Sequence, residues 1–352
     1  MVARFLAHLR PPLVVCGHLV ALVLLVLDAR REWSAYGLVM LLLLLGGLAV
    51  IPAALVESPR FRLISLVAQT IGAGVFNPHS RHPTLIAMEI GALDELSGGR
   101  VRLGIGSGLG HAVERMGFST QRSLTTLREA IVILRALLRG EEVNHIGAAF
   151  NVQRVKLDYL ARADIPIFMA ARGPNAVKAC GEIADGMIVS NMCAAGFVAK
   201  AAASLHDSAR AAGRTAMPGI VQYMPCVPRP DRDDAFRAAK RAIADMLPAY
   251  WALAQKLPDA KSALMTGSGI SDDDFASAAA RIKAGEAPDS VLDDRYVTAF
   301  AIAGNADDCR AQAVAYAAAG VTELALTFFG PTFVADMAYI GKAWLDKAWA
   351  AK

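Results

Sequence analysis

The sequence has few cysteines and little charge of either sign. Its five cysteines form no CxxC pair and have no histidine at ligand spacing, so neither a disulfide framework nor a metal site is predicted, in keeping with a reducing, cytoplasmic compartment. The formal net charge is only +4, and no basic run is interleaved with aromatic residues. The chain therefore lacks the signature of a nucleic-acid-binding protein.

Hydrophobic residues are in excess, and the excess lies at the N-terminus. Leu38–Val56 contains nineteen residues without a charge, about the length that spans a bilayer. Pro11–Leu27 is a second uncharged run of seventeen residues, and a charged turn at 28–32 separates the two. The simplest physical picture is a transmembrane hairpin with membrane contact through residues 11–56. A stretch that is not native to the gene is the other interpretation.

From residue 58 onward the composition is that of a soluble α/β chain. Apolar runs bounded by glycine and proline predict six strands, at 66–75, 101–105, 165–171, 187–190, 219–227 and 321–328. Helical periodicity predicts helices at 85–96, 119–139, 174–184, 194–212, from 231, 307–319 and 333–350. A hairpin is expected at 142–157 and an irregular, charged insertion before residue 294. Strands that alternate with helices in this way indicate a parallel sheet.

Two groups of small or polar residues stand at predicted strand ends. Gly74 and Val75 end the first strand and Asn77 follows; Gly106-Ser107-Gly108 ends the second. Glycine lets a ligand approach the backbone, and an Asn side chain can both donate and accept hydrogen bonds. Asn77 before Pro78 is equally well explained as a turn asparagine.

The segment Ala171-Arg-Gly-Pro-Asn175 is the strongest candidate for a phosphate site. A buried strand ends there, Gly173 frees the backbone, and Pro174 opens a helix at its first position. The N–H groups and the positive dipole end of that helix would point at one spot, and Arg172 could add a charged contact. Ser190, after the next strand, is a second contributor. The alternative is a well-capped helix start without a ligand.

Several motifs in a fixed order resemble those of a known superfamily. They are Asn77-Pro-His-Ser-Arg-His-Pro83, Leu93-Asp-Glu-Leu-Ser-Gly-Gly-Arg100, Leu103-Gly-Ile-Gly-Ser-Gly108, the helix Leu127–Gly140, Pro166–Pro174, Gly181–Gly186 and Phe300–Gly304. Together they resemble the luciferase-like flavin-dependent oxidoreductases, and most closely the branch of coenzyme F-420-dependent methylenetetrahydromethanopterin reductases. The resemblance covers about residues 66–345.

The resemblance implies a TIM (β/α)8-type barrel, of which the chain supplies six strand–helix units. Two units would occupy about sixty residues, and the hydrophobic N-terminus takes their place. We therefore expect residues 1–57 to form a separate hydrophobic, helical segment. Residues 58–352 would form a barrel domain that lacks its first two units and carries insertions near 141–164 and 247–297.

For the site, the resemblance implies a cis peptide at Gly74-Val75 that backs a flat cofactor ring. It implies cofactor contacts from the strand-end residues named above, which are Gly74, Val75, Asn77, Gly106, Ser107, Arg172, Gly173, Pro174, Asn175 and Ser190. The expected cofactor is coenzyme F-420, with FMN as the alternative.

No catalytic residue is predicted. Related enzymes place acidic or histidine residues on the two missing strands, or an acid after the Gly-x-Gly-x-Gly segment, where this chain has Leu109. His111 and Glu114 are better explained as a solvated helix start, and His79 and His82 as structural loop residues.

The expected reaction is hydride transfer between the bound cofactor and a small organic substrate. An FMN-dependent monooxygenase is the first alternative. A non-catalytic or truncated relative tethered to a membrane is the second. Association as a homodimer is common among such proteins.

Overall fold

The computed structural model describes residues 71–108 and 110–345. These lie within the second of two units into which the chain divides, Thr70–Lys352. The predicted transmembrane hairpin at residues 11–56 lies outside the described residues, as does residue 109. Within the described part, no helix is long and apolar enough to cross a membrane.

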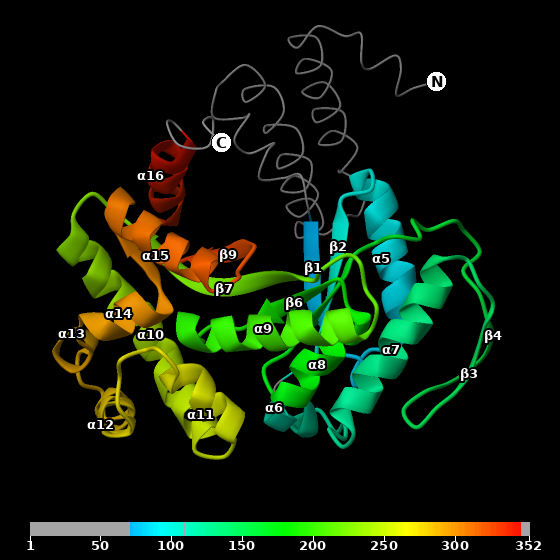
Figure 1. Cartoon of the computed structure of the whole chain (residues 1–352). Coiled ribbons are helices and arrows are strands. Elements are labelled where there is room, and N and C mark those ends of the chain that lie inside the picture. The colour runs from blue at the N-terminus through cyan, green and yellow to red at the C-terminus, as the bar shows by residue number, and fades with distance from the viewer. Residues whose placement is uncertain (1–70, 109, 346–352) are drawn as a thin grey trace, which may run out of the picture. The chain divides into compact units, whose positions relative to one another are not determined.

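One parallel sheet of seven strands organises the described part of the chain (Figure 1). The strand order is β1-β2-β5-β6-β7-β8, and β9 pairs with β7 beside β8. The strands are β1 (Ile71–Phe76), β2 (Val101–Ile105), β5 (Ile167–Ala170), β6 (Gly186–Val189), β7 (Gly219–Pro228), β8 (Ile302–Gly304) and β9 (Glu323–Phe328). A separate antiparallel hairpin consists of β3 (Val143–Ile146) and β4 (Asn151–Val155).

The six predicted strands are confirmed as β1, β2, β5, β6, β7 and β9, and so is the hairpin. The described part of the first strand begins at Ile71. The three-residue strand β8 was not predicted, because a segment that short shows no periodicity.

Helices cover one face of this sheet and form the main core with it. They are α5 (Pro83–Ser97), α7 (Ser123–Leu138), α8 (Pro174–Ile183), α9 (Ala195–Ala211), α15 (Ala306–Ala318) and α16 (Phe333–Leu345); the short helix α6 (Gly110–Arg115) follows β2. Fully buried side chains such as Leu103, Ile131 and Met187 belong to this core. A central strand such as β6, which is buried along its whole length, therefore reads as a continuous apolar run in the sequence.

The opposite face of the sheet is concave, and one ion pair demonstrates its curvature. Arg102 on β2 pairs with Glu323 on β9, although β5, β6 and β7 lie between those strands. The Arg102 guanidinium also lies 5.6 Å from the centre of the Phe168 ring. A Cβ at Gly186 would overlap that ring, so this glycine makes room for Phe168 inside the curve. The sheet is thus a curled, half-barrel form of the expected fold.

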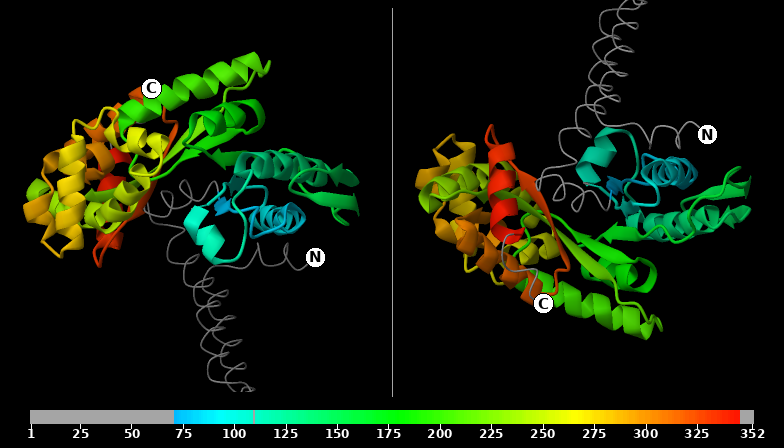
Figure 2. Two further views of the ribbon diagram at one scale, coloured as in Figure 1. Left: turned by 90° about the horizontal axis from the view of Figure 1, so that it is seen from below. Right: turned by 90° about the horizontal axis from the view of Figure 1, so that it is seen from above.

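The predicted helix from residue 231 is confirmed as α10 (Arg232–Ala254). The rest of the segment between β7 and β8 differs from the prediction, because it is helical rather than irregular. It consists of α11 (Pro258–Met265), α12 (Asp272–Lys283), α13 (Pro288–Val291) and α14 (Asp294–Phe300). These helices share a second hydrophobic cluster around Phe275, Tyr296 and Phe300. In Figure 2 they form the yellow and orange group at one end of the sheet, whereas the blue-green α5 and α7 lie at the other end.

Candidate functional site

Glycines bring the ends of β1 and β2 close together. The peptide between Gly74 and Val75 is cis, as the family resemblance implies. A Cβ at Gly74 would lie 2.7 Å from the Gly104 carbonyl oxygen, and one at Gly106 would lie 2.7 Å from Val75 Cγ1 and 2.8 Å from Ala170 Cβ. We call Gly74, Gly104 and Gly106 the glycine floor. At each of these positions, neighbouring backbone or side chains already fill the space that a Cβ would need, so only glycine fits.

Asn77 stabilises the loops that follow this floor. Its Oδ1 accepts a hydrogen bond from the His79 N–H at 2.9 Å, and its Nδ2 donates to the Ser107 carbonyl at 3.2 Å. Asn77 is therefore a turn asparagine that joins the β1 and β2 loops. An amide has a second N–H and a second lone pair, so a ligand contact from Asn77 remains compatible with this geometry.

The segment after β5 places Arg172 and Gly173 at the start of α8, as predicted. Gly173 is the N-cap in extended conformation, without a side-chain cap, and Pro174 occupies the first turn. The Nε atom of Arg172 is buried and has no hydrogen-bond partner among the described residues. Buried donors are rarely left unpaired, so this atom marks a place where a ligand acceptor fits.

An acidic residue that the sequence did not single out also lies at this helix start. A Cβ at Gly173 would be 2.8 Å from Oδ2 of Asp259, which belongs to α11. The carboxylate is favourably placed beside the positive end of α8. It would compete with any other anion at the same end of the helix.

Ser190 ends β6 within a cluster of polar side chains. Its Oγ lies 3.8 Å from Cys193 Sγ, and its carbonyl accepts a hydrogen bond from Gln222 Nε2 at 2.9 Å. The hydroxyl of Tyr250, on α10, lies near Ser190, and Arg172 lies near both Tyr250 and Cys193. Burial raises the pKa of the Cys193 thiol to about 11, so this cysteine stays protonated at neutral pH. We call Arg172, Ser190 and Tyr250 the polar corner.

Other predicted residues lie farther out or have structural partners. Pro174 and Asn175 are exposed at the α8 start, whereas Ser107 is partly buried in the β2 loop. His79 Nε2 contacts Ser123 Oγ at 3.2 Å, and His82 caps α5 by accepting from the Thr84 N–H, so both histidines are structural, as expected.

Neither Glu114 nor His111, the remaining acid–base candidates, is assigned a role in proton transfer. Glu114 accepts a hydrogen bond from Thr120, and the side chain of His111 lies outside the described part. In the described ranges, no His, Cys, Asp and Glu group of three or more could hold a metal ion. Tyr250 and Asp259 were missed because the long β7–β8 insertion delivers them, and no local motif marks either one.

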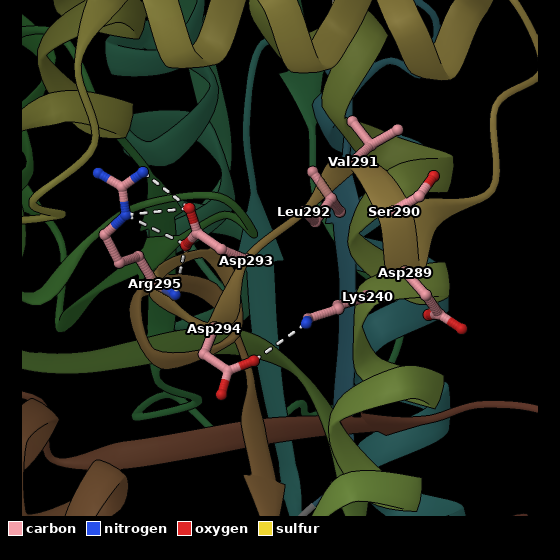
Figure 3. A pocket seen from close by; sticks show the side chains of 8 residues that line it. All are labelled: Lys240, Asp289, Ser290, Val291, Leu292, Asp293, Asp294 and Arg295. Atoms are coloured by element: carbon pink, nitrogen blue, oxygen red, sulfur yellow. Dashed lines mark hydrogen bonds and ion pairs between the residues drawn. The ribbon is translucent and has the colours of Figure 1, made fainter.

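A pocket of about 560 Å³ lies away from these strand ends, on the helical insertion. Figure 3 shows its lining, which consists of Lys240 from α10 and residues 289–295. Lys240 Nζ pairs with Asp294 at 3.0 Å and Arg295 pairs with Asp293 at 2.7 Å. Because its charged side chains are already paired, Asp289 with Arg241 outside the lining, and none comes from a strand end, this pocket is not the candidate site.

Comparison with known proteins gives three informative matches. The family model described as Luciferase-like monooxygenase matches residues 68–323. The chain is 31% identical over 276 residues to 5,10-methylenetetrahydromethanopterin reductase of Methanolobus tindarius, which covers 77% of this chain and 81% of that protein. It is 30% identical over 125 residues to an F-420-dependent glucose-6-phosphate dehydrogenase of Beutenbergia cavernae, covering 34% of this chain and 37% of that one.

The fold also matches a solved structure. Coenzyme F-420-dependent tetrahydromethanopterin reductase from Methanopyrus kandleri superposes with a TM-score of 0.66 at 25% identity, over 78% of this chain and 81% of that one. Sequence and structure therefore agree on the same group of relatives.

Proposed function

Because the chain belongs to the luciferase-like monooxygenase family, we propose that it is an oxidoreductase that transfers a hydride between bound coenzyme F-420 and a small organic substrate. Relatives with different substrates, a pterin and a sugar phosphate, share the F-420 cofactor in their names. The cofactor is therefore better supported than the substrate.

The observation that carries this proposal is the glycine floor. Added Cβ atoms at Gly74 or Gly106 would overlap neighbouring backbone or side chains, so glycine is required there despite its cost in chain entropy, and we infer that the closely packed backbone offers a flat surface. It lies at the carboxyl ends of parallel strands, where barrel enzymes place their ligands. A flat, uncharged surface suits the face of a tricyclic ring.

In this arrangement the protein binds and orients, and the cofactor, when bound, supplies the carbon that carries the hydride. The glycine floor supports one face of the ring and leaves the other face open to substrate. Asn77 fixes the β1 loop and offers its remaining amide capacity to the polar edge of the ring. Arg172, Ser190 and the backbone at Gly173-Pro174-Asn175 fit an anionic tail, as the unpaired Arg172 Nε indicates. No side chain is assigned to proton transfer.

By analogy with the reductase relatives, the substrate is a pterin that carries a one-carbon group. FMN is the second cofactor candidate, because the family is named for its monooxygenases and the floor does not distinguish a flavin from a deazaflavin.

The finer organisation of the chain belongs to the same proposal. A domain of residues 58–352 would lack the first two barrel units and follow a hydrophobic segment of residues 1–57. If that segment anchors the protein, the catalytic domain is cytoplasmic at a membrane surface, and extraction of native material with carbonate would leave it in the membrane fraction. A homodimer would elute at twice the mass of 37.2 kDa.

The proposal is tested by titrating the purified chain with coenzyme F-420 and with FMN, following quenching of each cofactor's fluorescence. We expect micromolar binding of F-420 and at least tenfold weaker binding through Gly106→Ala. Gly72→Ala is the matched control, since nothing lies within 4 Å of a Cβ there. Binding of FMN alone would favour the monooxygenase alternative, and binding of neither would favour the non-catalytic one.

A further inference from the structure

Tyr250 connects the helical insertion to the candidate site. It lies on α10, two residues after Pro248 inside the helix, and packs against the hydrophobic cluster that includes Met192 and Ala194, which follow β6. Its hydroxyl lies near Ser190, the residue at the end of β6. A helix from the insertion thus delivers a phenol to the carboxyl edge of the sheet.

The polar corner has more donors than acceptors. Arg172 contributes a guanidinium whose buried Nε has no partner, while Ser190 and Tyr250 each contribute a hydroxyl. Burial raises the pKa of Tyr250, so its hydroxyl stays protonated at neutral pH and able to donate. The thiol of Cys193, 3.8 Å from Ser190 Oγ, is a weak acceptor. The carboxylate of Asp259 lies close to Gly173, the residue that follows Arg172 in the chain.

We propose that Tyr250 is a phosphate-binding residue of the cofactor site, and that its hydroxyl, with Arg172 and Ser190, holds the phosphate group of the cofactor tail. This inference rests on the proposed function and deepens it, because it assigns a residue from outside the barrel strands to the same site. Anionic oxygens take up the donors that the corner leaves unpaired. The insertion then contributes to cofactor affinity as well as to folding.

The test compares ligands that share a ring and differ in the phosphate. Wild type, Tyr250→Phe and Tyr159→Phe are titrated with coenzyme F-420, with its phosphate-free deazariboflavin core, and with the pair FMN and riboflavin. Tyr159 is the matched control. Its hydroxyl also donates a hydrogen bond, at 2.6 Å, but the acceptor is the carbonyl of Met88 on α5 and not a residue of the polar corner. Since a hydrogen bond to a charged group is lost, Tyr250→Phe should weaken binding of the phosphate-bearing ligand about tenfold and change binding of the phosphate-free ligand less than twofold.

Each outcome separates the two levels of inference. If Tyr250→Phe weakens both members of a pair equally, the hydroxyl only supports the structure and the inference is wrong, while the proposed function stands. If affinity does not change, the hydroxyl makes no contact with the ligand, which also overturns it. If wild type binds none of the four ligands, the proposed function fails, and the inference fails with it.

Discussion

Buried polar groups of two kinds occur in this fold, and they differ in how completely they are paired. Asp94 is 3% exposed and accepts hydrogen bonds from Arg162 Nε at 2.9 Å, from Arg162 NH2 at 3.0 Å and from the Val101 N–H at 3.0 Å. Arg172 Nε, by contrast, is buried without any partner among the described residues. The first group holds α5 to β2, whereas the second lies at the end of β5.

Glu129 repeats the pattern of Asp94. From α7 it accepts the N–H groups of Ala148, Ala149 and Phe150, at 2.8, 3.0 and 3.0 Å, and contacts His145 Nε2 at 3.2 Å. One carboxylate therefore fixes the turn of the β3–β4 hairpin. Buried side-chain atoms without a partner occur at Arg172, Asn191 and Gln222, and also farther away at Arg229, Asp272, Tyr296 and Trp344. Among them, Arg172 Nε belongs to a charged group and lies at the strand end where a ligand is proposed, whereas Asp94 and Glu129 are fully paired within the scaffold.

Removing a paired charge should have the largest effect. Asp94→Asn replaces a carboxylate oxygen with an N–H group that faces Arg162, and leaves that guanidinium without its buried counter-ion. We expect a loss of about 3 kcal/mol in the free energy of unfolding, measured by urea denaturation. Asp164→Asn removes the other, exposed partner of Arg162 and should cost less than about 0.5 kcal/mol. Equal losses in the two variants would show that burial does not matter to this pair.

Acid should weaken the same paired groups. The hydrogen bond and charge of Arg162 lower the pKa of Asp94. Burial alone would raise the pKa of Glu129, but its backbone N–H donors and His145 outweigh that effect and lower it. Because both folded-state pKa values are depressed, their stabilisation is complete above the unfolded values of about 4 and is lost as pH falls through the folded ones.

The melting temperature should accordingly decline below about pH 4, and Glu129→Gln should flatten that decline. Glu141→Gln, at an exposed pair with Arg139, is the control and should leave the slope unchanged. A Glu129 variant with the wild-type slope would contradict the role given to this carboxylate.

Features that depend on neighbouring residues in the chain could be predicted from the sequence, whereas features that depend on distant residues could not. The strand and helix bounds follow from local pattern: Val101–Ile105 is a buried apolar run, and Gly98 ends α5 in a left-handed conformation. Arg172 and Gly173 were also found, because a strand end followed by Gly-Pro is a local signal.

Other features depend on distant contacts. Tyr250 and Asp259 reach the site only through the packing of α10 and α11, which no window of sequence reveals. The sequence prediction misses the helices α11 to α14 despite local signals, such as the capping box of Ser271 and Asp274 at α12. The charged composition of this segment favours an irregular structure in a reading of the sequence alone.

Removing the unpaired charge should affect binding and spare stability. Arg172→Met keeps an unbranched, flexible side-chain stem and breaks no ion pair within the described part, so the free energy of unfolding should stay within about 0.5 kcal/mol of wild type. Cofactor affinity, measured by fluorescence titration, should fall about tenfold because a charge-assisted contact is lost. Arg210→Met, at an exposed pair on α9, should change neither quantity. A large loss of stability would instead show that Arg172, like Asp94, stabilises the fold.

The smallest effect is expected from Asp259, whose carboxylate lies beside Gly173 at the start of α8. Asp259→Asn removes a negative charge from the helix end at which the cofactor's phosphate is proposed to bind. Affinity for coenzyme F-420 or FMN should rise about threefold, a change of about 0.7 kcal/mol that is typical of one partly screened charge. Riboflavin, which has no phosphate, should bind unchanged, and Asp245→Asn on the exposed face of α10 should have no effect. Weaker binding of the phosphate-bearing ligands would mean that Asp259 supports the ligand rather than competing with it, and the polar corner would then need a protonated acid or a bridging cation to explain it.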